Sequence, residues 1–133
     1  MKEKKILIVD DEVAILDVLK EMFTMNGYQV LVAENAEEAL EILGNESIMV
    51  MFLDLKLPGM NGIDLCRQIR KNDNFAIIYA LTGYVNIYGF LECRRAGFDD
   101  YFIKPVNIKI LLEATEIAFK KIERWKIDED DLL

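Results

Sequence analysis

The chain has 133 residues, the size of one domain, and its hydrophobic fraction of 53% is enough to form a single core. Its net charge of −8 disfavours direct binding to nucleic acid or to an anionic membrane surface. It has no histidine, and its two cysteines, Cys66 and Cys93, form no CxxC pair. The usual zinc, haem and blue-copper sites and the histidine-dependent catalytic triads are therefore not expected.

The sequence predicts no membrane span, because no uncharged apolar run reaches about 18 residues. The N-terminus leads directly into an apolar run of four residues, which is too short for a secretory signal. We therefore expect a cytoplasmic protein with no membrane contact.

Five apolar runs predict five strands, and most are nearly continuous, which is typical of strands buried on both faces. They lie at residues 5–9, 28–33, 48–53, 75–81 and 99–103.

Helical patterns lie between these runs. The first has its apolar face at Ile15, Leu19, Met22 and Phe23, and Gly27 is expected to end it. The second is expected to begin at Asn35, with Glu38 as its capping-box partner, and to end at Gly44. The third and fourth are predicted at 62–71 and 85–95, and the fifth runs from Asn107 to Trp125 with one apolar stripe.

The order of elements is a strand followed by a helix, five times. Right-handed crossovers then give an α/β fold, a five-stranded parallel sheet with helices on both faces. In such sheets, ligands bind at the carboxyl ends of the strands near the topological switch point.

Polar residues stand at four of these strand ends. Asp10 and Asp11 follow the first strand, Asp54 the third, Thr82 the fourth and Lys104 the fifth. Carboxylates close together repel one another, and Mg²⁺ relieves this because it prefers oxygen ligands and binds carboxylates together with a phosphate oxygen.

The combination therefore predicts a metal ion, a phosphoryl group held by Lys104 and Thr82, and an aspartate that accepts the phosphoryl group. Each residue alone has an ordinary explanation. Asp11 could serve only as a helix cap, Lys104-Pro105 only as a loop and Thr82 only as part of a turn. The joint placement on four strands favours the site.

These residues resemble the receiver domain of two-component response regulators across about residues 4–124. The matching stretches are ILIVDDE (6–12), LDLKLPGMNG (53–62), ALTG (80–83) and AGFDDYFIKP (96–105). The resemblance implies a flavodoxin-like doubly wound (βα)5 fold with strand order 2-1-3-4-5. It also divides the chain into a receiver domain, residues 1–126, and an acidic tail or linker, residues 127–133.

The resemblance also implies a role for each site residue. Asp54 would be the phosphoacceptor, Lys104 would pair with the phosphoryl oxygens, and the Lys104-Pro105 bond would be cis. The metal ligands would be Asp10, Asp11, Asp54 and the backbone carbonyl of Lys56, with Mg²⁺ as the cofactor. Thr82 and Tyr101 would be the switch residues.

The implied partner is a sensor histidine kinase or a histidine phosphotransfer protein. The chain would be no enzyme beyond its own phosphorylation and slow autodephosphorylation. Glu12 is assigned to the helix N-terminus rather than to the metal. Tyr84, two residues after Thr82, is hypothesised to screen attacking water and to prolong the phosphoryl state.

A hydrophobic surface is predicted on the fourth and fifth helices, because their apolar residues cannot all face the sheet. It is expected to change on phosphorylation and to contact an output, a partner or a second copy of the chain in a homodimer. Its residues are Ile87, Tyr88, Leu91, Ile110 and Ile117, with Val85 and Phe90 nearby.

Other classes fit less well. A haloacid-dehalogenase-type phosphatase would require a second acid where Lys56 stands, and a flavin carrier would require a phosphate-binding loop where Asp10, Asp11 and Glu12 stand. Nucleotide-binding glycine motifs are absent from the sequence. A degenerate receiver that only binds partners is the remaining alternative.

Overall fold

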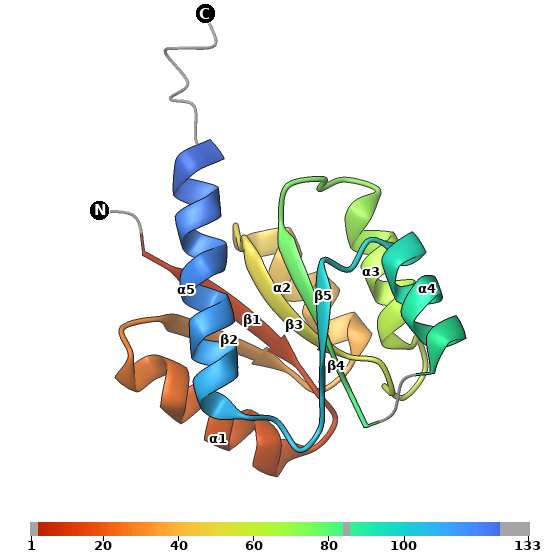
Figure 1. The fold of residues 1–133 in the computed structure, drawn as a ribbon, viewed down its shortest axis with the longest axis horizontal. Helices are drawn as coiled ribbons and strands as arrows, with labels where there is room; N and C mark the ends of the chain where they lie inside the picture. Colours follow the sequence, from red (N-terminus) through yellow and green to blue (C-terminus); the bar gives the residue numbers. More distant parts are fainter. Residues whose placement is uncertain (1–2, 84–85, 126–133) are drawn as a thin grey trace, which may run out of the picture.

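The structure, a computed structural model, describes residues 3–83 and 86–125, and these form five strands and five helices in alternation (Figure 1). The strands are β1 (Lys5–Val9), β2 (Gln29–Ala33), β3 (Val50–Asp54), β4 (Ile77–Thr82) and β5 (Asp100–Ile103). The helices are α1 (Val13–Met25), α2 (Ala36–Asn45), α3 (Gly62–Arg70), α4 (Ile87–Ala96) and α5 (Ile108–Trp125).

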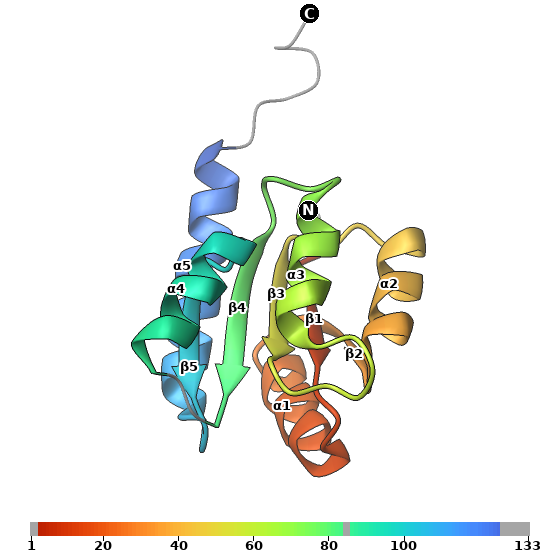
Figure 2. The ribbon, with the colours of Figure 1, turned by 90° about the vertical axis from the view of Figure 1, so that its right-hand side faces the viewer.

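All neighbouring strands pair in parallel, in the order β2-β1-β3-β4-β5, as predicted. The sheet separates two hydrophobic clusters, one holding side chains of α1 and α5 and the other holding side chains of α2, α3 and α4. Figure 2 shows α5 and α2 on opposite sides of the sheet, with the carboxyl ends of the strands at its lower edge. The molecule is thus a three-layer α/β sandwich.

The three central strands, β1, β3 and β4, are buried almost throughout, whereas β2 and β5 are partly exposed because they form the sheet edges. The strand predicted at 75–81 begins two residues later, at Ile77. The Asp73 carboxylate accepts hydrogen bonds from the backbone N–H groups of Phe75 and Ala76, which makes this segment a turn. Phe75 is accordingly 69% exposed.

Asparagine side chains cap four helices. Asn35, Asn61, Asn86 and Asn107 accept hydrogen bonds from the third helical residue of α2, α3, α4 and α5, respectively. Glu38 is predicted to complete a capping box with Asn35. Its carboxylate does accept a backbone hydrogen bond at the start of α2, but the donor is the N–H of Glu34. Helices α3 and α4 follow the carboxyl ends of β3 and β4, so both begin on the side of the carboxyl edge of the sheet.

None of the helices in the described ranges is long and apolar enough to cross a membrane.

Candidate functional site

The ammonium group of Lys104 joins the carboxyl ends of β1 and β3. Its Nζ atom lies 2.8 Å from Asp10 Oδ2, 3.3 Å from Asp54 Oδ2 and 3.5 Å from Glu12 Oε1. Lys104 reaches this position because it directly follows β5, whereas Asp10 follows β1 and Asp54 ends β3. The parallel sheet therefore brings together the residues that the sequence placed at the strand ends.

These groups are removed from solvent. Asp10 is fully buried, Asp54 is 3% exposed, and the Lys104 side chain is 15% exposed. Burial raises the pKa of Asp54 above its ordinary value, and the Asp10 carboxylate raises it further, against the opposing effect of the Lys56 N–H and Lys104. Burial alone would lower the pKa of Lys104, but hydrogen bonding and attraction from Asp10, together with Asp54, outweigh it and raise that pKa.

One oxygen of Asp10 fits a site for a cation. Asp10 Oδ1 accepts a hydrogen bond of 2.8 Å from the Glu12 backbone N–H, which fixes the side chain. Asp10 Oδ2 is buried, and its partner among the described residues is the Lys104 ammonium, 2.8 Å away. Because Lys104 also faces Asp54 and Glu12, it offsets only part of the negative charge, and a divalent cation would offset the rest.

The acidic residues after β1 form a compact group. Oxygen atoms of Asp10, Asp11 and Glu12 all lie within 4.8 Å of one another, with Asp11 and Glu12 exposed. An Asp-Asp-Glu group of this kind provides the hard oxygen ligands that Mg²⁺ prefers.

Glu12 is the N-cap residue of α1, so it stands at the helix N-terminus, as expected. Its side chain makes no capping hydrogen bond, and its Oε1 atom lies 3.5 Å from the Lys104 ammonium. The local sequence does not signal this long-range contact.

Lys56 contacts the predicted acceptor through its backbone. The Lys56 N–H donates a hydrogen bond of 3.1 Å to Asp54 Oδ1. This contact orients the Asp54 carboxylate and leaves its Oδ2 atom toward Lys104. The metal-binding role of the Lys56 carbonyl stays a prediction.

Thr82 and Lys104 are connected through the main chain. Thr82 is 5% exposed at the end of β4, and its carbonyl oxygen accepts a hydrogen bond of 2.7 Å from the Lys104 N–H. The Lys104-Pro105 bond is cis, as the resemblance implied. The two residues therefore stand next to each other beside Asp54, since β3 and β4 are neighbours.

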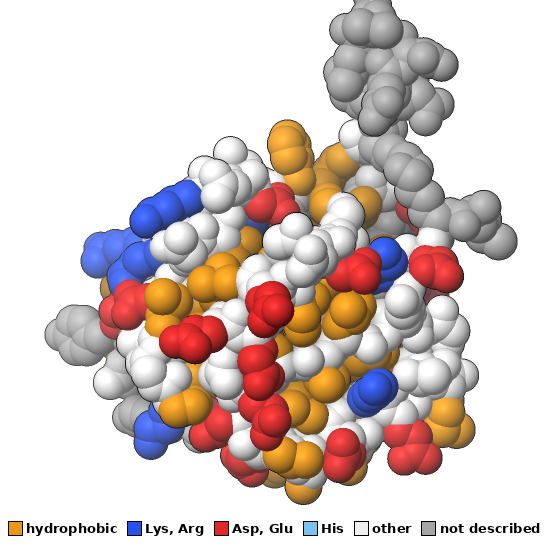
Figure 3. All heavy atoms as spheres, turned by 180° about the vertical axis from the view of Figure 1, so that it is seen from behind, with side chains coloured by type: hydrophobic (Ala, Val, Ile, Leu, Met, Phe, Trp, Pro, Cys, Tyr) orange, Lys and Arg blue, Asp and Glu red, His pale blue; other side chains and the backbone are white. Residues whose placement is uncertain are grey.

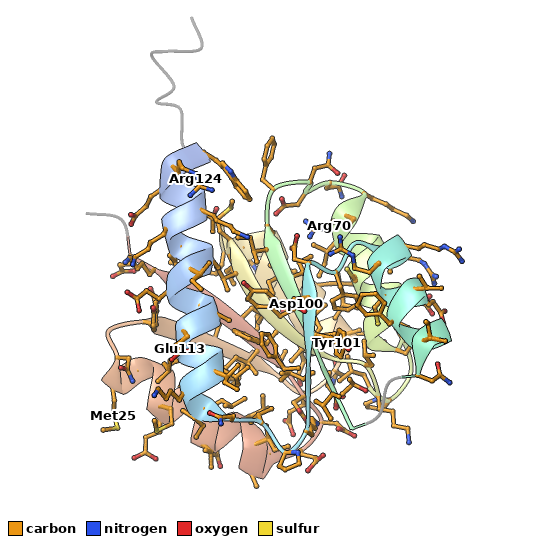
Figure 4. All side chains as sticks on the ribbon, viewed as in Figure 1. Met25, Arg70, Asp100, Tyr101, Glu113 and Arg124 are labelled. Carbon is orange, nitrogen blue, oxygen red and sulfur yellow. The ribbon has the colours of Figure 1, made fainter. Side chains whose placement is uncertain are left out.

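Tyr101 lies on β5 on the side of α4 (Figure 4). Its ring meets the ring of Phe90, on α4, edge to face at a centroid distance of 5.3 Å. The side chain is partly buried against the cluster under α4. A change in the position of Tyr101 would therefore change its contact with Phe90 and the packing of α4.

Apolar side chains on α4, β5 and α5 are exposed to an extent that supports the predicted surface. The exposed fractions are Ile87 70%, Leu91 42%, Ile103 53%, Ile110 47% and Ile117 54%. The sequence reasoning missed Ile103, which is exposed because β5 is an edge strand. We call these five residues the α4–β5–α5 patch.

Some of the predicted features lie outside the described residues. They are the Tyr84 hypothesis, Val85, the side chain of Tyr88 and the tail at 127–133.

Acidic side chains gather on the face shown in Figure 3, behind the sheet as seen in Figure 1. Glu37, Glu38 and Glu41 of α2, all exposed, contribute to the negative surface of the chain. This distribution agrees with the net charge of −8.

The fold and the site define a class. A doubly wound five-stranded parallel sheet carries an acidic group, a buried aspartate and a lysine at its carboxyl edge, with a threonine beside them. This is the arrangement that the resemblance to receiver domains implied.

Comparison with known proteins gives the family. Residues 6–116 match the family model described as response regulator receiver domain. The chain therefore belongs to the response regulator receiver domain family and is a receiver domain of two-component signalling.

Two relatives match the chain over most of its length. The chain is 34% identical over 116 residues to sporulation initiation phosphotransferase F of Bacillus subtilis, covering 87% of this chain and 94% of that protein. A CheY-like receiver domain protein from Methanospirillum hungatei matches with a TM-score of 0.90 and 35% identity, covering 94% of this chain and all of that one.

Other relatives are longer. An uncharacterized transcriptional regulatory protein, YrkP of Bacillus subtilis, is 40% identical over 103 residues, which are 77% of this chain but 44% of that protein. The chain thus spans about half the length of several curated relatives that it matches.

Proposed function

We propose that Asp54 accepts a phosphoryl group, in a Mg²⁺-dependent reaction, from a phosphohistidine of a sensor histidine kinase or phosphotransfer protein. The observation that carries this proposal is the Lys104 ammonium, 2.8 Å from buried Asp10 and 3.3 Å from buried Asp54. Lys104 can stay near Asp54 and pair with the incoming phosphoryl oxygens as a point charge.

In this reaction an oxygen of the Asp54 carboxylate bonds to phosphorus while the bond from phosphorus to the donor imidazole nitrogen breaks, and that nitrogen keeps the electron pair. The Lys56 N–H holds Asp54 Oδ1 and so limits the rotation of the nucleophile. Asp10, Asp11, Asp54 and the Lys56 carbonyl would hold Mg²⁺. When bound, Mg²⁺ would offset the negative charge that gathers on the phosphoryl oxygens.

The new charge would be read by the residues next to Asp54. Phosphorylation adds about −1.5 to −2 charges at pH 7. The Thr82 hydroxyl would move to a phosphoryl oxygen, and Tyr101 would turn inward and change its contact with Phe90 on α4. The α4–β5–α5 patch would then switch between two arrangements and control an output or a partner.

A homodimer through this patch, a receiver domain at 1–126 with a tail at 127–133, and a cytoplasmic location stay parts of the proposal. So does the slow loss of the phosphoryl group, with Tyr84 as the residue that screens water. Beyond its own phosphorylation and dephosphorylation, no enzymatic activity is proposed.

The test is phosphorylation by acetyl phosphate, a small-molecule phosphoryl donor, followed by intact-protein mass spectrometry. The unmodified sequence should gain one phosphoryl group with Mg²⁺ and none when EDTA is present. Asp54→Asn should gain none, whereas Asp17→Asn, which changes an exposed acid of α1, should react like the unmodified sequence. Equal labelling of Asp54→Asn would refute the assignment of the acceptor.

A further inference from the structure

Gly62 joins the start of α3 to the end of β3. It is the first residue of α3, it is buried, and its N–H donates a hydrogen bond of 3.0 Å to the Leu55 carbonyl oxygen. This bond closes the loop of residues 55–62. Asn61, which precedes Gly62, caps α3 by accepting a hydrogen bond from the Asp64 N–H. The residue that caps the helix and the residue that closes the loop are therefore neighbours in the chain.

There is no room for a side chain at position 62. A methyl group on its Cα would overlap the Asp54 carbonyl oxygen and would lie 2.9 Å from both the Asp54 carbonyl carbon and the Leu55 Cα. The atoms that it would meet belong to the backbone of Asp54, the last residue of buried strand β3, and of Leu55, which follows it, so they cannot turn away as a flexible side chain could. Any side chain here must push the loop and the strand apart.

The loop that would move carries the groups that hold Asp54. The Lys56 N–H orients Asp54 Oδ1, and the Lys56 carbonyl is proposed as a metal ligand. Both lie between the end of β3 and Gly62. A displacement at residue 62 therefore changes the position of Lys56 relative to the Asp54 carboxylate.

We infer that Gly62 is a positioning residue of the phosphoacceptor site, which acts through Lys56 by allowing α3 to approach the Asp54 main chain. The inference rests on the proposed function of Asp54. It assigns to position 62 a role in metal affinity and phosphoryl transfer, although Gly62 itself has no side chain to contribute.

The experiment compares Gly62→Ala with Gly44→Ala in the full chain. Gly44 is a suitable control because it also lies on a helix and an added methyl group there would meet no atom within 4 Å. The readouts are thermal unfolding, the position of the Lys56 amide signal in ¹H–¹⁵N NMR, the Mg²⁺ dissociation constant from NMR titration, and phosphorylation by acetyl phosphate.

Gly62→Ala should stay folded, shift the Lys56 amide signal, bind Mg²⁺ about tenfold more weakly and accept the phosphoryl group more slowly at saturating Mg²⁺. Gly44→Ala should match the unmodified sequence in every site readout. A tenfold loss of affinity is the size expected when a group that orients a metal ligand is disturbed.

Three results would overturn the inference. They are unchanged Mg²⁺ affinity and phosphorylation in Gly62→Ala, equal losses in Gly44→Ala, and a Gly62→Ala chain that fails to fold even with a stabilising osmolyte. The last would make Gly62 a requirement of folding rather than of the site. If the unmodified sequence itself accepts no phosphoryl group, the proposed function fails instead.

Discussion

Lys104 faces more negative charge than it can neutralise. Two buried carboxylates, Asp10 and Asp54, lie within 3.3 Å of its single ammonium group, and Glu12 approaches at 3.5 Å. Buried charges are stable only when they are paired and hydrogen-bonded. The excess negative charge explains why a divalent cation suits this edge of the sheet.

Cys66 is predicted to be unreactive in the folded protein. It is fully buried, its Sγ lies 3.5 Å from the Ala96 carbonyl oxygen, and burial raises its pKa to about 11. At pH 8, iodoacetamide should alkylate Cys66 in urea but only slowly in the native state, as measured by peptide mass spectrometry. Rapid native alkylation would contradict the burial of α3 against α4.

The raised pKa of Cys66 also affects the free energy of unfolding. Because the folded-state pKa of Cys66 lies above the ordinary value of 9.0, the folded state retains the thiol proton longer than the unfolded state. The contribution of Cys66 to the free energy of unfolding is therefore complete below pH 9 and is lost as the pH rises toward 11.

At the scale of elements, Arg70 connects the end of α3 with the starts of β4 and β5. Its guanidinium donates to the carbonyl oxygens of Gly97 and Ala76 and to the Asp99 carboxylate, at 2.7 to 3.0 Å. Asp99 in turn accepts a hydrogen bond from the Ile78 N–H. Figure 4 shows Arg70 near the end of the molecule opposite the candidate site, where the C-terminal ends of α3 and α4 lie.

Arg70→Ala should lower the free energy of unfolding by about 2–3 kcal/mol, because it leaves partly buried carbonyl groups without donors. Arg95→Ala, an exposed arginine on α4, should change it by less than about 0.5 kcal/mol. Urea denaturation measures both values. Equal effects of the two substitutions would show that the Arg70 contacts do not hold these elements together.

Gly97 ends α4 and accepts hydrogen bonds from Arg70. Its φ of +112° is a conformation that other residues rarely adopt, and an added methyl group would lie 2.7 Å from the Arg70 Cγ. The glycine both ends α4 and leaves room for the arginine. The local sequence signals neither the hydrogen bonds between Arg70 and Gly97 nor their close approach, because the two residues are 27 residues apart.

At the scale of the whole molecule, the α4–β5–α5 patch is predicted to support self-association. Ile110→Glu combined with Ile117→Glu should weaken self-association in analytical ultracentrifugation, because charges cannot be buried in an apolar interface without cost. Val18→Glu, at a residue of α1 that is 50% exposed, is the control. Equal behaviour of the double variant and the unmodified sequence would count against the patch.

The alternation of strands and helices and the residues at the strand ends could be predicted because they depend on local patterns and on general rules of parallel sheets, whereas the strand order followed from the resemblance to receiver domains. Asp54 illustrates this, since it follows a continuous apolar run, and the run itself places it at the edge of the sheet. The contact of Glu12 with Lys104 could not be predicted, because the two residues are 92 residues apart in the chain.

The close approach at Gly62 also escaped the sequence reasoning. A glycine at the start of a helix has several ordinary explanations, and only the positions of the Asp54 and Leu55 backbone atoms distinguish between them. Contacts between distant segments are set by the packed fold rather than by neighbours in the chain.

The most direct test of the central claim uses beryllium fluoride, a mimic of the phosphoryl group, with Mg²⁺ and ¹⁹F NMR. The account predicts a bound fluoride signal for the unmodified sequence and for Asp17→Asn, and none for Asp54→Asn or after Mg²⁺ is removed. No bound signal for the unmodified sequence, or an undiminished signal for Asp54→Asn, would contradict the claim that Asp54 is a Mg²⁺-dependent phosphoacceptor.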